Sequence, residues 1–143
     1  MTTRQTSLLI FAVLLCSVPA LVSCGGSMMN TMGTRQLQSI AVTPATANAQ
    51  NFPNKQVQFT VMGDYTMAPM TGTPQVLWSI GNPFAKTPVP VGVTVDMNGI
   101  ATCTTFTGTV SIQATAPMDP SMPLSQMTMT TSNVAGMAQL TCP

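Results

Sequence analysis

The strongest constraint on the fold is an alternating stretch around the only Trp of the chain, Gln75-Val76-Leu77-Trp78-Ser79-Ile80-Gly81. Its apolar residues on one face share even numbers: Val76, Trp78 and Ile80. A period of two predicts a β-strand with one face in a core. Because Trp is the largest apolar side chain, we expect Trp78 to anchor that core and the other strands to pack around it.

The same alternation recurs along the chain between turns rich in Gly and Pro. The further predicted strands lie at residues 38–43, 55–62, 89–95, 100–104, 109–116 and 134–142. No segment shows a helical period of useful length. We therefore predict an all-β fold, a single immunoglobulin-like two-sheet β-sandwich of about seven strands over residues 37–143. The expected core anchors are Trp78, Phe59, Val57 and Ile112.

Some stretches fit this scheme less regularly. Leu37 is out of phase with Ile40 and Val42, so we interpret it as a contact at the start of the strand. Four odd-numbered valines predict one apolar face on an irregular edge strand: Val89, Val91, Val93 and Val95. Residues 63–74 and 117–126 are predicted to be loops. Residues 126–131 alternate Met with Thr and could form a short strand or hairpin arm.

Composition narrows the function classes. Apolar residues make up 45% of the chain, enough for a core, while charged residues make up only 5%. The near-neutral charge offers no basic surface for nucleic acid. The three acids, Asp64, Asp96 and Asp119, lie in separate segments, and the chain has no His and no Glu to serve as a general base. We therefore expect no enzyme activity and no cofactor.

The first residues are typical of an exported protein. Arg4 precedes an apolar run at residues 8–15, which predicts a signal peptide and is too short for a transmembrane helix. Leu21-Val22-Ser23-Cys24 then resembles the lipobox of bacterial lipoproteins. That resemblance implies cleavage before Cys24 and acylation of this residue, which would anchor the chain durably in a membrane. An ordinary signal peptide with an incidental Cys is the alternative.

The expected domain organisation follows from this leader. Residues 1–23 are the predicted signal peptide. Residues 24–36 combine the lipidated Cys with a Gly-rich flexible linker, and residues 37–143 form the domain. Gly25 stands where Asp is the usual signal for retention in the inner membrane, which favours the outer membrane or the cell surface.

Several runs within the domain resemble the bacterial immunoglobulin-like domain, group 2, over residues 37–142. They are Leu37-Gln38-Ser39-Ile40-Ala41-Val42-Thr43-Pro44, Gln56-Val57-Gln58-Phe59-Thr60-Val61-Met62-Gly63, Val76-Leu77-Trp78-Ser79, Asn98-Gly99-Ile100-Ala101-Thr102 and Gly108-Thr109-Val110-Ser111-Ile112-Gln113-Ala114-Thr115. The resemblance implies an immunoglobulin-like sandwich of the kind often found on cell-surface and adhesin proteins. The chain departs from the family pattern in the Met- and Pro-rich loop at 63–74 and in the long segment after Ala116.

Cys16 lies next to the apolar run and would leave with the predicted signal peptide, so two cysteines remain beside the anchor, Cys103 and Cys142. Because an exported protein usually oxidises a leftover pair, we predict a disulfide between them. It would close a span of 39 residues and would stabilise the fold by about 4 kcal/mol in the loop-entropy description. Cys103 is out of phase with Ile100, so the pairing requires a bulge or an edge position. A reactive thiol or a metal ligand is the alternative.

Methionine is the unusual component, with 13 residues in the chain. Clusters occur at Met28, Met29 and Met32, at Met67 and Met70, at Met118 and Met122, and at Met127 and Met129. Thioethers suit Cu(I), so a methionine-rich copper-binding module is one reading, and Met as a filler of loose apolar space is the other. Our leading expectation is a lipid-anchored, non-catalytic envelope protein for structural or adhesive contacts. Its expected partners are the membrane and an unknown surface protein or glycan.

Overall fold

The computed structural model describes residues 33–143. The expectations for the signal peptide, for Cys24 and for most of the linker lie outside this range. Gly33 to Gln36 precede the first strand, which starts at Leu37. No helix in the described range is long and apolar enough to cross a membrane.

The described residues form an all-β, sandwich-like fold, which confirms the predicted fold class. The strands are β1 (Leu37–Thr43), β2 (Thr46–Asn48), β3 (Gln56–Gln58), β4 (Thr60–Tyr65), β5 (Thr71–Gly72), β6 (Leu77–Ile80), β7 (Val93–Val95), β8 (Ile100–Cys103), β9 (Gly108–Pro117) and β10 (Asn133–Cys142). Three single-turn 3-10 helices interrupt them: η1 (Ala49–Asn51), η2 (Pro53–Lys55) and η3 (Leu124–Gln126).

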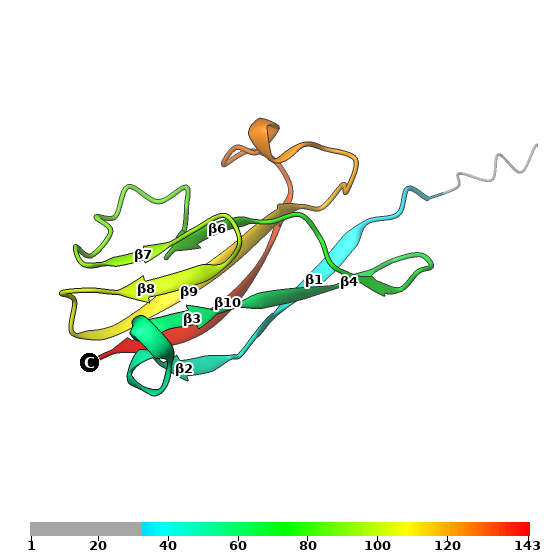
Figure 1. Ribbon diagram of the computed structural model, residues 1–143. Helices are drawn as coiled ribbons and strands as arrows, with labels where there is room; N and C mark the ends of the chain where they lie inside the picture. Colours follow the sequence, from blue (N-terminus) through cyan, green and yellow to red (C-terminus); the bar gives the residue numbers. More distant parts are fainter. Residues whose placement is uncertain (1–32) are drawn as a thin grey trace, which may run out of the picture. The chain divides into compact units, whose positions relative to one another are not determined.

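The strands pair in three sheets with the orders β2-β10-β9-β6, β1-β4-β5 and β3-β8-β7. Strands β3 and β4 follow each other in one line, so the two smaller sheets lie end to end (Figure 1). Buried side chains from all three sheets form one hydrophobic cluster. The two smaller sheets therefore act as one layer of the sandwich, and the four-stranded sheet acts as the other.

The predicted single strand at 55–62 is in fact two strands with different partners, which corrects the sequence reading. Val57 of β3 pairs with Ala101 of β8, whereas Val61 of β4 pairs with Val42 of β1. The change occurs at Phe59, whose backbone N–H donates to the Gly99 carbonyl at 2.9 Å. The alternation of side chains continues through the change, which is why the sequence pattern does not reveal it.

After the first predicted strand the chain forms a further strand with a different partner. Pro44 follows the end of β1, and the chain then forms β2, which pairs in parallel with β10. The out-of-phase position of Leu37 has a simple cause, because the register of β1 shifts between Leu37 and Ser39. A bulge of this kind places one extra residue in the strand, so Leu37 is buried on the same side as Ile40.

Phe59, Val57 and Ile112 are almost fully buried, as predicted for core anchors. Trp78 differs, because it packs against this core and remains only partly buried. Its strand, β6, is the edge strand of the four-stranded sheet and pairs only with β9. The core therefore centres on Phe59, and the indole of Trp78 forms part of its rim.

Other corrections concern the less regular stretches. Val89 and Val91 are 54% and 89% exposed, so the predicted apolar face holds only at β7. Residues 126–131 form no strand, because they continue from η3 into a turn. Within the predicted loop at 63–74, β4 extends to Tyr65 and pairs with β5 as a hairpin.

Candidate functional site

Trp78 separates two open grooves and lines both of them. The larger groove has a volume of about 530 Å³. Its lining residues come from the β3–β4 junction, the stretch before β6, β6 itself, the turn after β7 and η3. They are Gln58, Phe59, Thr60, Val61, Thr73, Pro74, Gln75, Val76, Trp78, Met97, Asn98 and Leu124. None of these side chains carries a charge. We refer to this concavity as the Trp78 groove.

The polar groups of the Trp78 groove are amides and hydroxyls. Gln58 is held in place, because its Nε2 donates to the carbonyl oxygens of Phe59 and Asn98, each at 2.8 Å. Gln75 is exposed, and its amide makes no hydrogen bond to other described residues. The Gln75 amide, with two donors and an acceptor, is therefore available to a ligand.

The indole of Trp78 offers a further donor. Among residues 33–143 no group accepts a hydrogen bond from its Nε1, and Nε1 is not among the buried unsatisfied atoms. The indole N–H therefore has no partner in the described range and is not completely buried. A Trp side chain that combines an apolar ring with a free donor is typical of surfaces that bind ligands.

Gly99 shapes the turn beside Trp78. This turn follows β7, and Asp96 organises it by accepting from the backbone N–H of Asn98 at 2.9 Å and of Ile100 at 2.8 Å. Gly99 has a φ of +81°, a conformation that favours glycine. A Cβ there would lie 2.8 Å from the Trp78 ring, so only glycine lets the turn pack against the indole.

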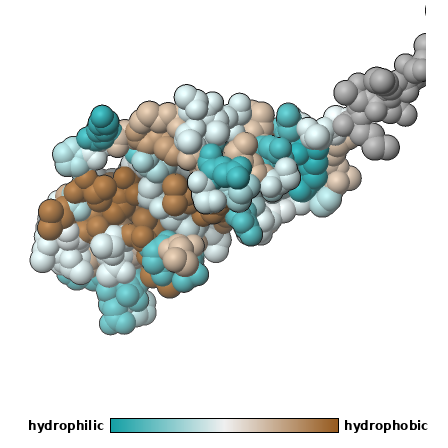
Figure 2. Space-filling model, turned by 90° about the horizontal axis from the view of Figure 1, so that it is seen from above, coloured by the Kyte–Doolittle hydropathy of each residue, from teal (hydrophilic) through white to brown (hydrophobic). Residues whose placement is uncertain are grey.

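The second groove, on the other side of Trp78, has a volume of about 420 Å³. It lies between β6, β7 and the connection at 81–92, and its larger apolar side chains are Leu77, Ile80, Val89, Val93 and Val95. Strongly hydrophobic residues gather at the end of the surface that carries β7 and this connection (Figure 2). This groove is the open edge of the sandwich.

A third concavity of about 270 Å³ lies beneath the connection between β9 and β10. Tyr65 lines it, and the guanidinium of Arg35 lies 3.4 Å from the centroid of the Tyr65 ring. The Arg35 Nη2 also donates to the Pro69 carbonyl at 2.8 Å. Because these contacts engage Arg35 with the β4–β5 hairpin, we interpret this region as structural.

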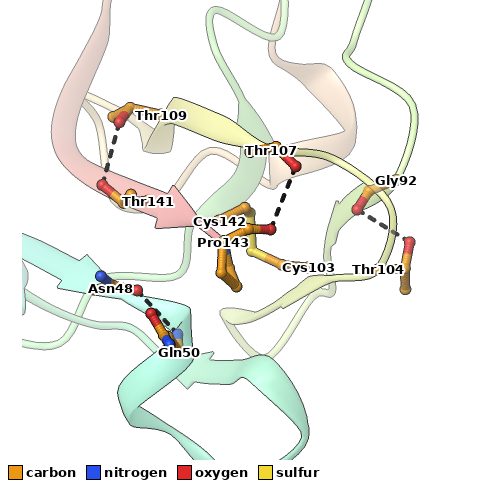
Figure 3. Close-up of a disulfide and its surroundings, with 10 residues drawn as sticks. All are labelled: Asn48, Gln50, Gly92, Cys103, Thr104, Thr107, Thr109, Thr141, Cys142 and Pro143. Carbon is orange, nitrogen blue, oxygen red and sulfur yellow. Dashed lines mark hydrogen bonds between the residues drawn. A yellow bond between two sulfur atoms is a disulfide. The ribbon is translucent and has the colours of Figure 1, made fainter.

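The predicted disulfide between Cys103 and Cys142 is present, with a Cα–Cα distance of 5.7 Å (Figure 3). It joins β8 to β10 and therefore the two layers. The phase problem disappears because Cys103 shares its buried face with Ala101, whereas Ile100 is the first residue of the strand. Both cysteines are buried, at 3% and 2% exposure, so this pair acts as a covalent link between layers.

The three acids of the chain remain apart and serve local structure. Asp64 accepts a hydrogen bond from Ser39 Oγ at 2.8 Å, and Asp96 organises the turn described above. Asp119 accepts from Ser121, and this side-chain hydrogen bond, with a second one from the Ser121 backbone, lowers the pKa of Asp119. In the described part of the chain no three residues of His, Cys, Asp or Glu gather into a metal site.

The sequence identified Trp78 as a key residue of the core, but it did not reveal the groove. Gln75 and Asn98 lie 23 residues apart, and both line it. They lie together because β6 is at the edge of one layer while the turn after β7 belongs to the other. No short motif encodes that arrangement.

Comparisons with known proteins give no family for this chain. No family model matches the sequence, and no curated protein matches it.

Proposed function

We propose that this chain is a lipid-anchored, non-catalytic protein of the cell envelope, and that its immunoglobulin-like module binds neutral glycan chains in the Trp78 groove. The lipobox-like sequence at Cys24 supports the anchor. The resemblance of residues 37–142 to the group 2 bacterial immunoglobulin-like domain, together with the sandwich-like fold, supports the module.

The single observation that carries the binding proposal is the chemistry of the groove. A half-buried indole with a free N–H lies beside neutral amides and hydroxyls, and no charged side chain lines the concavity. A sugar ring presents C–H groups to an aromatic face and hydroxyls to amides, so it complements both features. The absence of charge favours a neutral glycan over an anionic one.

The only Trp of the chain reports directly on the groove, so its fluorescence gives the test. Titrating the purified protein with neutral envelope polysaccharides should shift the Trp78 emission in a saturable way. Replacing Gln75→Ala should weaken binding by roughly threefold to tenfold, the cost of one lost hydrogen bond. Gln38→Ala, an exposed amide on β1, is the matched control and should bind as the parent does.

Two results would replace this proposal. A saturable response to isolated surface proteins, with none to glycans, would favour a protein partner in the same groove. If Gln75→Ala binds the glycan as tightly as the parent does, the glycan-binding site lies on another surface.

The anchor is tested separately. Cells supplied with labelled palmitate should incorporate it into the parent protein and not into Cys24→Ala. If the parent carries no label, the leader is an ordinary signal peptide with an incidental Cys.

Copper handling is the second candidate. Met67 and Met70 are 40% and 57% exposed and flank the turn of the β4–β5 hairpin. Thioethers in this position are open to a soft ion such as Cu(I). An anaerobic titration with Cu(I) decides the question, because tight stoichiometric binding that is lost in Met67→Leu/Met70→Leu would support this function.

A further inference from the structure

Methionine is distributed unusually between the interior and the surface. Residues 33–143 contain nine Met, and the buried hydrophobic core of this range contains none of them. Six of the ten exposed large apolar side chains are Met, namely Met62, Met67, Met70, Met97, Met129 and Met137. The remaining three, Met118, Met122 and Met127, are half-buried.

This distribution does not fit Met as a simple replacement for Leu. Such a drift would place Met in the core, because Met packs there at little cost. The large fully buried positions are instead occupied by residues such as Leu37, Ile112 and Leu140. Met is therefore excluded from the places where its loss would disturb packing.

The exposed thioethers also do not form one binding surface. Met62 lies on β4, in the layer of smaller sheets, and Met137 lies on β10, in the four-stranded layer. Met97 is in the turn after β7, and Met129 is in the connection between β9 and β10. A role that uses separate, individually accessible thioethers fits this spread better than one ligand site.

The other oxidisable side chains of the described range are less exposed than the six exposed methionines. Both cysteines are oxidised to a buried disulfide, and Tyr65 is only 4% exposed. Trp78 is half-buried. Exposure governs how fast a thioether is oxidised, so a two-electron oxidant that reaches this surface meets methionine first.

We propose that the exposed methionines act as a renewable sink for small oxidants, such as hypochlorous acid and hydroperoxides. Each thioether sulfur donates an electron pair to the oxidant and gains one oxygen atom, which forms a sulfoxide. A hydroperoxide is reduced to the alcohol, or hypochlorous acid to chloride and a proton. Methionine sulfoxide reductases, supplied with a thiol reductant, return the sulfur to the thioether and release water.

The fold explains why such a sink would be renewable. A sulfoxide is polar, so it disrupts a hydrophobic core but is tolerated in solvent. With Met absent from the described core, oxidation of the six exposed residues leaves the sandwich intact. The sulfoxides stay at the surface, where a reductase can reach them.

The first experiment titrates the purified protein with hypochlorous acid and, separately, with hydrogen peroxide. Peptide mass spectrometry should show the six exposed Met oxidised before Met118, Met122 and Met127. The circular-dichroism spectrum should keep its β character, and the melting temperature should fall by less than about 5 °C. Treatment with both sulfoxide reductases should restore the original mass.

A pair of variants then separates a sink from incidental reactivity. Replacing the six exposed Met by Leu should strongly reduce the fast phase of oxidant consumption and the protection of a bystander protein in the same solution. Replacing Met118, Met122 and Met127 by Leu is the matched control and should retain both. The proposal is overturned if the six-residue variant protects the bystander as well as the parent does. It is also overturned if oxidation unfolds the parent, or if the reductases do not restore it.

Discussion

The disulfide end of the sandwich and its Trp78 edge are built from the same alternating pattern, yet they differ in what covers them. At the disulfide end, β10 has a partner on each side, and Leu140 and Cys142 are almost fully buried. At the edge, β6 has one partner, and its inward-facing Trp78 is only partly buried. Alternation determines which side chains face inward, but the neighbouring strands determine whether the inward face is shielded from solvent.

The contacts around each region reinforce this difference. Near the disulfide, Thr109 and Thr141 join their hydroxyls at 3.2 Å between β9 and β10, and Thr107 donates to the Pro143 carbonyl (Figure 3). Around Trp78, the indole N–H and the amide of Gln75 remain available. The first region therefore stabilises the fold, while the second offers unsatisfied groups that suit binding.

The largest effect should come from removing a core side chain beside the disulfide. Leu140→Ala should lower the free energy of unfolding by about 3 to 5 kcal/mol, because Leu140 is fully buried and its loss leaves a cavity. Leu77→Ala, at the exposed edge, should cost less than about 1 kcal/mol. Urea unfolding measures both. Equal losses would show that the edge is as closely packed as the interior.

Opening the disulfide should have the next largest effect. The double variant Cys103→Ala/Cys142→Ala should lose about 2 to 4 kcal/mol, because the link between β8 and β10 no longer restricts the unfolded chain. Trp78 emission in the folded state should stay unchanged, since the two regions are independent. Reduced parent protein serves as the control and should match the variant. An altered Trp78 emission would show that the disulfide also shapes the groove.

Gly99→Ala tests the edge directly and should cost about 1 to 3 kcal/mol. The added Cβ meets the indole of Trp78 and the Phe59 carbonyl, so the Trp78 emission should also shift. Gly81→Ala is the matched control, because Gly81 has a φ of +70° with no atom near its Cβ position. It should show the backbone cost without the spectral shift. A shift in both variants would show that the emission does not report contact with Gly99.

These two regions also show which features of the structure could be predicted from the sequence. The burial of Phe59, Val57 and Ile112 was predictable, because period-two alternation is a local property. The switch of partners at Phe59 was not, since β3 and β4 keep one alternation while they pair with different strands. The partial exposure of Trp78 depends on the place of β6 in its sheet, which is set by residues far away in the chain.

The candidate site shows the same limit. The Cys103–Cys142 pair was predictable, because residues 37–143 contain only these two cysteines, which allow one pairing. The Trp78 groove required knowledge of where two layers end, and so did the exposure of each methionine. Sequence reasoning detected the Met clusters as unusual, but burial alone separates a surface role from a packing role.

The smallest effect concerns Asp119, in the connection between β9 and β10, away from both the core and the disulfide. The hydrogen bond from Ser121 Oγ to Asp119 Oδ1, at 2.7 Å, is the main cause of the lowered pKa of this carboxyl. Ser121→Ala should therefore raise the pKa, and only part of the way, because the Ser121 backbone N–H still donates to Oδ1 at 2.9 Å. A lowered folded-state pKa contributes stability above the unfolded value, which is lost as the pH falls through the folded value. The stability of the variant should thus be less sensitive to acid than that of the parent.

Carboxyl carbon shifts in an NMR titration measure the pKa of Asp119. The exposed Ser125→Ala is the control and should leave this pKa unchanged. If the pKa of Asp119 is unchanged in Ser121→Ala, the backbone N–H of Ser121 alone accounts for the lowered value.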